Sequence, residues 1–457
     1  MTFATVDPCT GQRLRTFAPH SPEEVEARVE RAREAVHVLR GTPFAERARW
    51  MERVAALLEE EAERHARTMT RERGKPLEAA RAEVLKCAAT CRYYAEHAER
   101  FLADEPVDTA PDTSFVRYQP LGVVLAIMPW NFPFWQVVRF AAPALMAGNV
   151  GLLKHAPSVP GCALALEELF IRGGFPAGAF QALFVEVDGV RRLIEDPRIH
   201  AVTLTGSEGA GRDVGARAGG QIKKVVLELG GSDPFVVLPS ADLDAAVETA
   251  VKARLLNNGQ SCIAAKRFIA PASIYPEFER RFVERMRRAV VGNPLEKDTE
   301  VGPLALAHIR EGLHAQVERS VAAGARLLLG GVLPPGPGFW YPPTVLAQPP
   351  PGCPAHREEL FGPVAVLFRA EDAEDALRLA NDTPYGLGAT VWTRDEAEQR
   401  RFIDGLEAGT VSVNGMVASD PRLPFGGVKH SGHGRELARQ GLLEFLNIKT
   451  VRVTAPG

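Results

Sequence analysis

Short apolar runs typical of β-strands alternate with helix-compatible segments between residues 121 and 231. The runs are LGVVLAIM, NVGLLKHA, FQALFV, HAVTLT and KKVVLEL. This alternation predicts a parallel sheet covered by helices on both faces, because helical crossovers join the strands of such sheets. The same rhythm restarts after GGSDPFVVL and predicts a second α/β domain from about residue 232. A chain of 457 residues is long enough for two or three domains.

The N-terminal part of the chain has a mostly helical pattern. Ser21, Pro22 and Glu24 form a capping-box signature that predicts the start of a helix. Two longer helical patterns follow, at about 45–72 and 78–103.

Two β-like segments, 112–120 and 445–454, fit neither domain. Orphan strands of this kind commonly pair across subunits. We therefore expect a homo-oligomer, either a homodimer or a homotetramer.

The charge and the hydropathy pattern exclude several classes of partner. The chain has 54 basic and 57 acidic residues, so it lacks the basic signature of a protein that binds nucleic acid or an anionic membrane. The stretch MTFATVDPCTGQRLR has no apolar core of a signal peptide, and the most apolar region, 121–153, is interrupted by Asn131, Arg139 and several prolines. We expect a cytoplasmic protein whose partner is a small molecule, with no nucleic acid and no membrane.

The cysteines give no sign of a metal centre. None forms a C-x-x-C pair or a Cys/His cluster at zinc spacing, so we expect no structural metal. Their wide scatter fits reduced thiols in the cytoplasm, and the sequence assigns no role to Cys87 and Cys91, which lie one helical turn apart.

Four stretches that could carry chemistry lie where a predicted strand ends. They are PWNFPF (129–134), TLTGSEGAG (203–211), LELGGSDPF (227–235) and NNGQSCIAAKR (257–267). Ligands bind at the carboxyl ends of strands in open α/β sheets, because loops and helix N-termini gather there. We expect the four stretches to converge on one site.

Each stretch taken alone has two interpretations. Cys262 is either a nucleophile or a buried small side chain, and Glu228 is either a general base or a carboxylate in a salt bridge. Asn131 is either a turn former or an oxyanion donor. The glycine-rich turn from Gly206 to Gly211 either binds a phosphate or is a tight turn for steric reasons.

The chain resembles the NAD(P)-dependent aldehyde dehydrogenases along essentially its whole length. PWNFP, LELGGSDP, NNGQSC, EELFGPV and PFGGVKHSGHGRE stand in the order and spacing of that family. The resemblance implies an α/β fold with a Rossmann-like cofactor-binding domain (1–103 and 121–231), an α/β catalytic domain (232–435) and a β oligomerisation arm (104–120 and 436–457).

The resemblance also implies an aldehyde oxidation. Cys262 would be the nucleophile, Asn131 and the Cys262 backbone N–H the oxyanion hole, and Glu228 the general base. A cysteine hydrolase or acyltransferase would need no dinucleotide site, and no histidine in these motifs is placed to act as its base. A non-catalytic binding protein is disfavoured because every catalytic position is filled.

The expected cofactor is NAD or NADP. Lys154 would reach the adenosine ribose or its phosphate, and Glu359 the nicotinamide ribose, although a solvated lysine and a helix-cap glutamate are the plainer interpretations. NAD-selective members often carry a glutamate three residues after this lysine, where this chain has Pro157, so NADP remains open. The positions implied to bind the cofactor are Trp130, Lys154, Gly206, Ser207, Leu229, Glu359 and Phe361.

Arg139 bears on the substrate. In WNFPFWQVVR it matches an arginine of the succinate-semialdehyde branch of the family, which implies succinate semialdehyde as the aldehyde. That branch often has a second arginine where this chain has Leu256, so the substrate carboxylate would rely on Arg139 and Ser419. The alternatives are a structural ion pair for Arg139 and a broad specificity for aliphatic aldehydes.

Overall fold

The computed structural model describes residues 3–110 and 112–454. Its first sheet contains the five apolar runs of 121–231 as parallel neighbours, in the order β9-β8-β5-β6-β7, with the short β19 antiparallel at the β9 edge. The predicted parallel sheet is thus confirmed. The strands are β5 (Val123–Met128), β6 (Val150–His155), β7 (Phe180–Ala182), β8 (Ile199–Thr205), β9 (Lys224–Glu228) and β19 (Gly432–His433).

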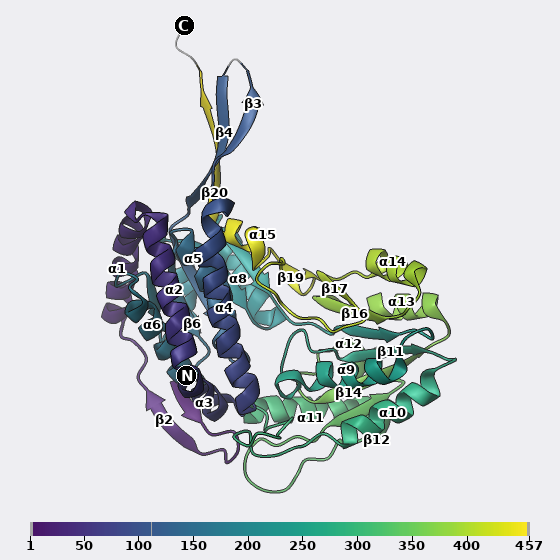
Figure 1. Ribbon diagram of the computed structural model, residues 1–457. Helices are drawn as coiled ribbons and strands as arrows, with labels where there is room; N and C mark the ends of the chain where they lie inside the picture. Colours follow the sequence, from purple (N-terminus) through teal and green to yellow (C-terminus); the bar gives the residue numbers. More distant parts are fainter. Residues whose placement is uncertain (1–2, 111, 455–457) are drawn as a thin grey trace.

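Helices surround this sheet (Figure 1). The capping box is formed, with the Glu24 N–H donating to Ser21 Oγ and the Ser21 N–H to Glu24 Oε2. The pattern at 45–72 is two helices that meet at Glu61, not one. The helices of this domain are α1 (Pro22–Gly41), α2 (Phe44–Glu60), α3 (Ala62–Arg73), α4 (Leu77–Phe101), α5 (Trp135–Met146), α6 (Pro160–Gly173), α7 (Val187–Glu195) and α8 (Glu208–Gly220).

The second sheet confirms the α/β rhythm expected after residue 232. Its order is β12-β13-β14-β11-β10-β16-β17, and every pair except β12 with β13 is parallel. The strands are β10 (Pro234–Val237), β11 (Arg267–Pro271), β12 (Arg326–Leu329), β13 (Thr344–Ala347), β14 (Val364–Ala370), β16 (Gly388–Trp392) and β17 (Thr410–Val413).

The remaining elements of the second unit are short connections and covering helices. The helices are α9 (Leu243–Leu255), the 3₁₀ turn η1 (Leu256–Gly259), α10 (Tyr275–Arg287), α11 (Ala307–Ala322), α12 (Pro354–Arg357), α13 (Ala373–Asn381) and α14 (Glu396–Gly405). Two small antiparallel sheets lie outside both large sheets. β1 (Phe3–Val6) and β2 (Arg13–Phe17) form a hairpin, and β15 (Tyr385–Gly386) pairs with the distant β18 (Val428–Lys429).

The two orphan segments pair with each other in the same chain. β20 (Leu446–Val453) runs antiparallel to β4 (Asp112–Pro120), which also pairs with β3 (Glu105–Thr109). The three strands project from the body as a narrow arm (Figure 1). α15 (Ala438–Leu443), just before β20, packs on α4 and α5 and so anchors the arm to the first domain.

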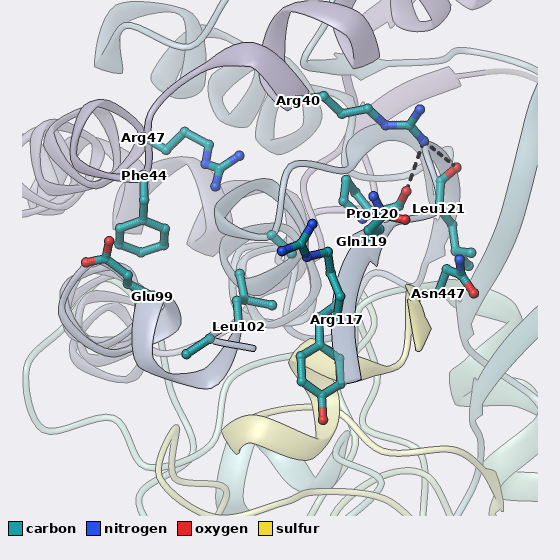
Figure 2. Close-up of a pocket in the computed structure, with 13 residues that line it drawn as sticks. Arg40, Phe44, Arg47, Glu99, Leu102, Arg117, Gln119, Pro120, Leu121 and Asn447 are labelled. Carbon is teal, nitrogen blue, oxygen red and sulfur yellow. Dashed lines mark hydrogen bonds between the residues drawn. The ribbon is translucent and has the colours of Figure 1, made fainter. Parts of the chain in front are cut away.

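The helices of the described chain are too short or too polar to cross a membrane. A cavity of about 860 Å³ lies at the foot of the arm. There Arg40 donates to the carbonyl oxygens of Pro120 and Leu121, and Arg47 and Arg117 also line the wall (Figure 2). This cavity shares no lining residue with the two cavities at Cys262.

Candidate active site

Two cavities meet at Cys262. One, of about 250 Å³, is lined by residues of the turns after β5, β8 and β9, and the other, of about 270 Å³, by side chains of α4, α5 and the 416–419 segment. Cys262 and Gln136 line both. The Cys262 thiol can therefore contact a ligand in either cavity. The structure thus brings together the four stretches expected to converge, although the Cys262 stretch follows α9 and η1 and precedes β11 (Arg267–Pro271), and so does not lie at the end of a strand as expected.

The turn that presents Cys262 depends on two asparagines and a glycine. Asn257 and Asn258 have φ angles of 54° and 58°, a left-handed conformation that Asn tolerates better than most residues. Asn258 Nδ2 also donates to the carbonyls of Gly74 and Pro303. Gly259 has φ 71°, and a Cβ there would lie 2.2 Å from the Gly362 carbonyl oxygen. Asn257, Asn258 and Gly259 therefore allow the left-handed backbone conformation on which this turn depends.

The Cys262 thiol is half-buried, and it is protonated at rest. Burial raises the pKa of Cys262 to about 12, although nearby Arg139 and Lys266 act in the opposite direction. Lys266 lies under the loop, where Nζ donates to the carbonyl oxygens of Ser261 and Cys262, both at 3.0 Å. Attack by this sulfur consequently requires that a base or a bound ligand help remove the proton.

Asn131 is buried beside the cysteine loop. Its Nδ2 donates to the Gln260 carbonyl oxygen at 3.1 Å, and its Oδ1 accepts from Gln136 Nε2 at 3.1 Å. The Asn257 side chain donates in turn to the Asn131 carbonyl oxygen at 2.7 Å. These contacts hold the amide in one orientation. An amide NH₂ has two N–H groups, so one remains for a ligand in the cavity that Asn131 and Cys262 both line.

Glu228 lies at the end of β9 and is 2% exposed. Neither carboxylate oxygen has a hydrogen-bond partner within the part of the chain that the structure describes. Burial raises the pKa of Glu228 well above its usual value, and Arg139 opposes that rise. A Cβ on Gly426 would lie 2.8 Å from Glu228 Oε1, so the carboxyl group faces that loop. Glu228 lines neither cavity in this arrangement.

Arg139 has an acidic partner of its own. Its Nε forms an ion pair with Glu436 Oε2, and the two side chains are 3% and 4% exposed. The guanidinium also donates to Thr205 Oγ1 at 3.3 Å and lies 4.7 Å from the centre of the Phe425 ring. The structural ion pair considered above is present, while Arg139 still lines the cavity beside Cys262.

Most of the expected cofactor positions line the cavity on the β9 side. Trp130, Gly206, Ser207, Leu229, Glu359 and Phe361 are in its wall. Ser207 caps α8, accepting from the Ala210 N–H at 3.3 Å, so the first N–H groups of that helix lie at the cavity edge. Free N–H groups at a helix start suit a phosphate, so this cavity suits the part of a dinucleotide that carries a phosphate.

Two of the expected cofactor residues have particular surroundings. Glu359 is no simple helix cap, because it accepts from the Gly231 N–H at 3.1 Å and pairs with Lys266 at 3.2 Å. Lys154 lies one residue before the end of β6 and outside this cavity, and burial lowers the pKa of its ammonium group. Within the described ranges, no cluster of three His, Cys, Asp or Glu side chains could hold a metal ion.

Sequence reasoning missed Lys86. It lies on α4 and lines the cavity with Arg139 and Ser419, and its Nζ donates to Ser419 Oγ at 2.8 Å. No motif surrounds it, and a lysine on a helix is usually a solvated one. The partner is 333 residues away, so only the folded chain shows the pair.

Comparisons with known proteins agree with this arrangement. The model of the aldehyde dehydrogenase family matches residues 1–451. A curated relative in Mycobacterium tuberculosis (strain ATCC 25618 / H37Rv), named succinate-semialdehyde dehydrogenase (NADP(+)) 1, is 57% identical over 454 residues, with 99% of each chain covered. A Synechocystis relative named probable succinate-semialdehyde dehydrogenase (NADP(+)) is 54% identical over 451 residues, again with 99% of each chain covered.

Solved structures give the same result for the fold. The succinic semialdehyde dehydrogenase of Streptococcus pyogenes in complex with NADP⁺ superposes with a TM-score of 0.96 at 35% identity, over 98% of this chain and 99% of that one. The structure of Gox0499 has a TM-score of 0.98 at 42% identity, over 99% and 100% of the two chains.

Proposed function

Because the chain belongs to the aldehyde dehydrogenase family, we propose that it oxidises succinate semialdehyde to succinate with NADP⁺. The observation that carries this proposal is the position of Cys262 between a cavity suited to a dinucleotide and a second cavity with cationic side chains. The curated relatives whose names specify succinate semialdehyde and NADP(+) support it.

The first half of the reaction takes place on Cys262. The Cys262 thiol passes its proton to water, and the resulting thiolate Sγ bonds to the aldehyde carbon. The electron pair of the C=O π bond moves to the oxygen, which becomes the oxyanion of the thiohemiacetal. We assign the Asn131 side-chain N–H and the Cys262 backbone N–H to that oxyanion, because Asn131 and Cys262 line the same cavity. A dinucleotide held by Trp130, Ser207 and Glu359 would supply the acceptor for the hydride of the former aldehyde carbon. A thioester on Cys262 remains.

The second half releases the acid. A water molecule attacks the thioester carbon while the Glu228 carboxylate takes its proton, and the Cys262 thiolate leaves. In the structure Glu228 faces the Gly426 loop, and burial raises its pKa. Only its carboxylate form, turned towards Cys262, can act as the base.

The preference for NADP⁺ follows from the residues after β6. Pro157 stands three residues after Lys154 and places no carboxylate against a 2′-phosphate. The half-buried Lys154 ammonium could pair with that phosphate. In NAD⁺ the Lys154 ammonium would meet the ribose 2′-hydroxyl instead of a phosphate, and this contact lacks the attraction between opposite charges.

Absorbance of the reduced nicotinamide tests the activity directly. The purified chain with succinate semialdehyde should form NADPH and succinate in equal amounts, and faster than NADH from NAD⁺. The Cys262→Ala variant should bind NADP⁺ as well as the wild type does but form no NADPH. Oxidation by that variant at a substantial fraction of the wild-type rate would remove Cys262 from the mechanism.

The cellular setting and the assembly are part of the proposal. We propose a cytoplasmic enzyme, which the six free cysteines support. We propose that the chain divides into a cofactor-binding domain (1–103 and 121–231), a catalytic domain (232–435) and an oligomerisation arm (104–120 and 436–457). The arm would join the copies of a homodimer or homotetramer, because both of its edge strands are largely exposed. Light scattering on the intact chain measures the mass of the assembly and so distinguishes a monomer, a dimer and a tetramer.

A further inference from the structure

Three cationic side chains line the cavity on the substrate side of Cys262: Lys75, Lys86 and Arg139. Two of them are already neutralised by a buried carboxylate. Lys75 pairs with Glu83, each 2% exposed, and Arg139 pairs with Glu436. Glu83 is the only acidic residue among those that line this cavity. Its negative charge is already paired with Lys75.

Lys86 is different, because no carboxylate of the described chain lies within ion-pair distance of it. Its Nζ donates to Ser419 Oγ at 2.8 Å and lies 4.1 Å from the centre of the Trp135 ring. An ammonium group has three N–H donors, so at least one remains for a ligand. Burial, and next the neighbouring Arg139, lower the pKa of Lys86 to about 8, and the opposing effects of Asp420 and Glu83 do not cancel this shift.

The rest of the wall is largely apolar. Phe132, Trp135, Ile263, Val417 and Phe425 are among the lining residues. A cavity of about 270 Å³ suits a molecule of a few carbon atoms. With one uncompensated cation and Cys262 both in the wall, the matching ligand is a short aliphatic aldehyde that carries one negative charge.

From these observations we infer that Lys86, together with Ser419, binds the carboxylate of the aldehyde substrate and so determines the preference for an anionic semialdehyde. This inference rests on the proposed function and assigns the substrate subsite within it. The carboxylate of the substrate supplies the negative charge that no side chain provides within ion-pair distance of Lys86. Arg139 keeps its bond to Glu436 and forms the wall behind the substrate.

The test compares two four-carbon aldehydes, succinate semialdehyde and butanal, with NADP⁺ as the second substrate. For Lys86→Met, kcat/KM for succinate semialdehyde should fall about 10- to 100-fold, mainly through a higher KM, while kcat/KM for butanal stays within about 2-fold. Lys86→Arg should recover most of the loss. Lys252→Met, which removes an exposed lysine on α9, is the matched control and should change neither value.

The possible outcomes separate the inference from the proposed function. Equal losses on both aldehydes, or an unchanged preference in Lys86→Met, would overturn the role of Lys86. A wild-type enzyme that prefers butanal would instead contradict the proposed substrate. If Lys86→Met melts at a much lower temperature than the wild type, Lys86→Gln keeps a polar group of similar length and should show the same selective loss.

Discussion

Asn131 Nδ2 donates to the carbonyl oxygen of Gln260 at 3.1 Å, so the side chain assigned to the oxyanion is held by the loop that carries the nucleophile. Asn131 follows β5 of the first sheet and Gln260 precedes β11 of the second, and their relative position is set by this bond and by the Asn257 contact to the Asn131 backbone. A donor fixed in advance stabilises a developing negative charge without reorganisation.

Replacing Asn131 by Ala should therefore lower kcat by about 10²- to 10³-fold, the usual effect of losing one oxyanion donor. The KM for NADP⁺ should change little, because the cofactor cavity keeps its other walls. Steady-state kinetics measure both parameters. A variant with near-normal kcat would show that the amide only shapes the turn.

Glu228→Gln should separate the two halves of the reaction. Thioester formation does not need the base, so this variant should release about one equivalent of NADPH per active site in a rapid burst and then nearly stop. Stopped-flow absorbance records the burst. Repeated rapid turnovers would assign the base to another group.

The pKa of Glu228 predicts the direction in which kcat changes with pH. Burial raises the pKa of Glu228 well above its usual value, and only the deprotonated form can accept a proton from water. When thioester hydrolysis limits the rate, kcat for the wild type should rise with pH through that raised pKa. The slow residual rate of Glu228→Gln should not show this rise.

Arg139→Met should act mainly on stability. Removal of one partner from a buried ion pair leaves the other charge unpaired and typically costs about 3 to 5 kcal/mol. Thermal unfolding should show a lower melting temperature, and the added change Glu436→Gln should restore part of it. If Arg139→Met keeps its melting temperature and loses activity only on succinate semialdehyde, the arginine binds the substrate directly.

The preference for the anionic aldehyde should depend on pH in the wild type. Lys86 has a pKa of about 8, so it is charged below that pH and neutral above it. The charged or titratable groups that face it are Arg139 on α5, Asp420 after β17, and Glu83 and Cys87 on α4. The ratio of kcat/KM for succinate semialdehyde to that for butanal should fall as the pH rises through about 8.

That ratio cancels the ionisations of Cys262 and Glu228, because both aldehydes use these groups. Lys86→Met should give a flat profile at the lower ratio. A wild-type ratio that stays constant across this range would show that Lys86 does not bind the carboxylate.

Pro157→Glu should change the choice of cofactor. A carboxylate three residues after Lys154 would repel a 2′-phosphate but could accept a hydrogen bond from a ribose hydroxyl. We expect the KM for NADP⁺ to rise more than the KM for NAD⁺. Equal changes in the two KM values would show that residue 157 does not face the 2′ position.

The sequence by itself determined the two parallel sheets and the convergence of the motifs. Each apolar run of 121–231 became a strand, because a buried parallel strand requires a continuous apolar segment and the crossover helix requires its own period. The stretch around Cys262 could be located because NNGQSC matches a motif of the family, and the structure shows that its asparagines and glycine meet local backbone demands. Strand hydrophobicity, helix period and turn residues each depend on a few neighbouring residues, so a single sequence is enough to predict them.

Tertiary structure decided which distant groups meet. The helical pattern at 45–72 gave no sign of the break at Glu61, and the two orphan strands found each other within one chain. Arg139 is matched to Glu436, whereas Lys86 is matched only to a hydroxyl 333 residues away. Whether a buried charge is neutralised depends on what packing places within a few ångströms of it, and neither periodicity nor a motif carries that information.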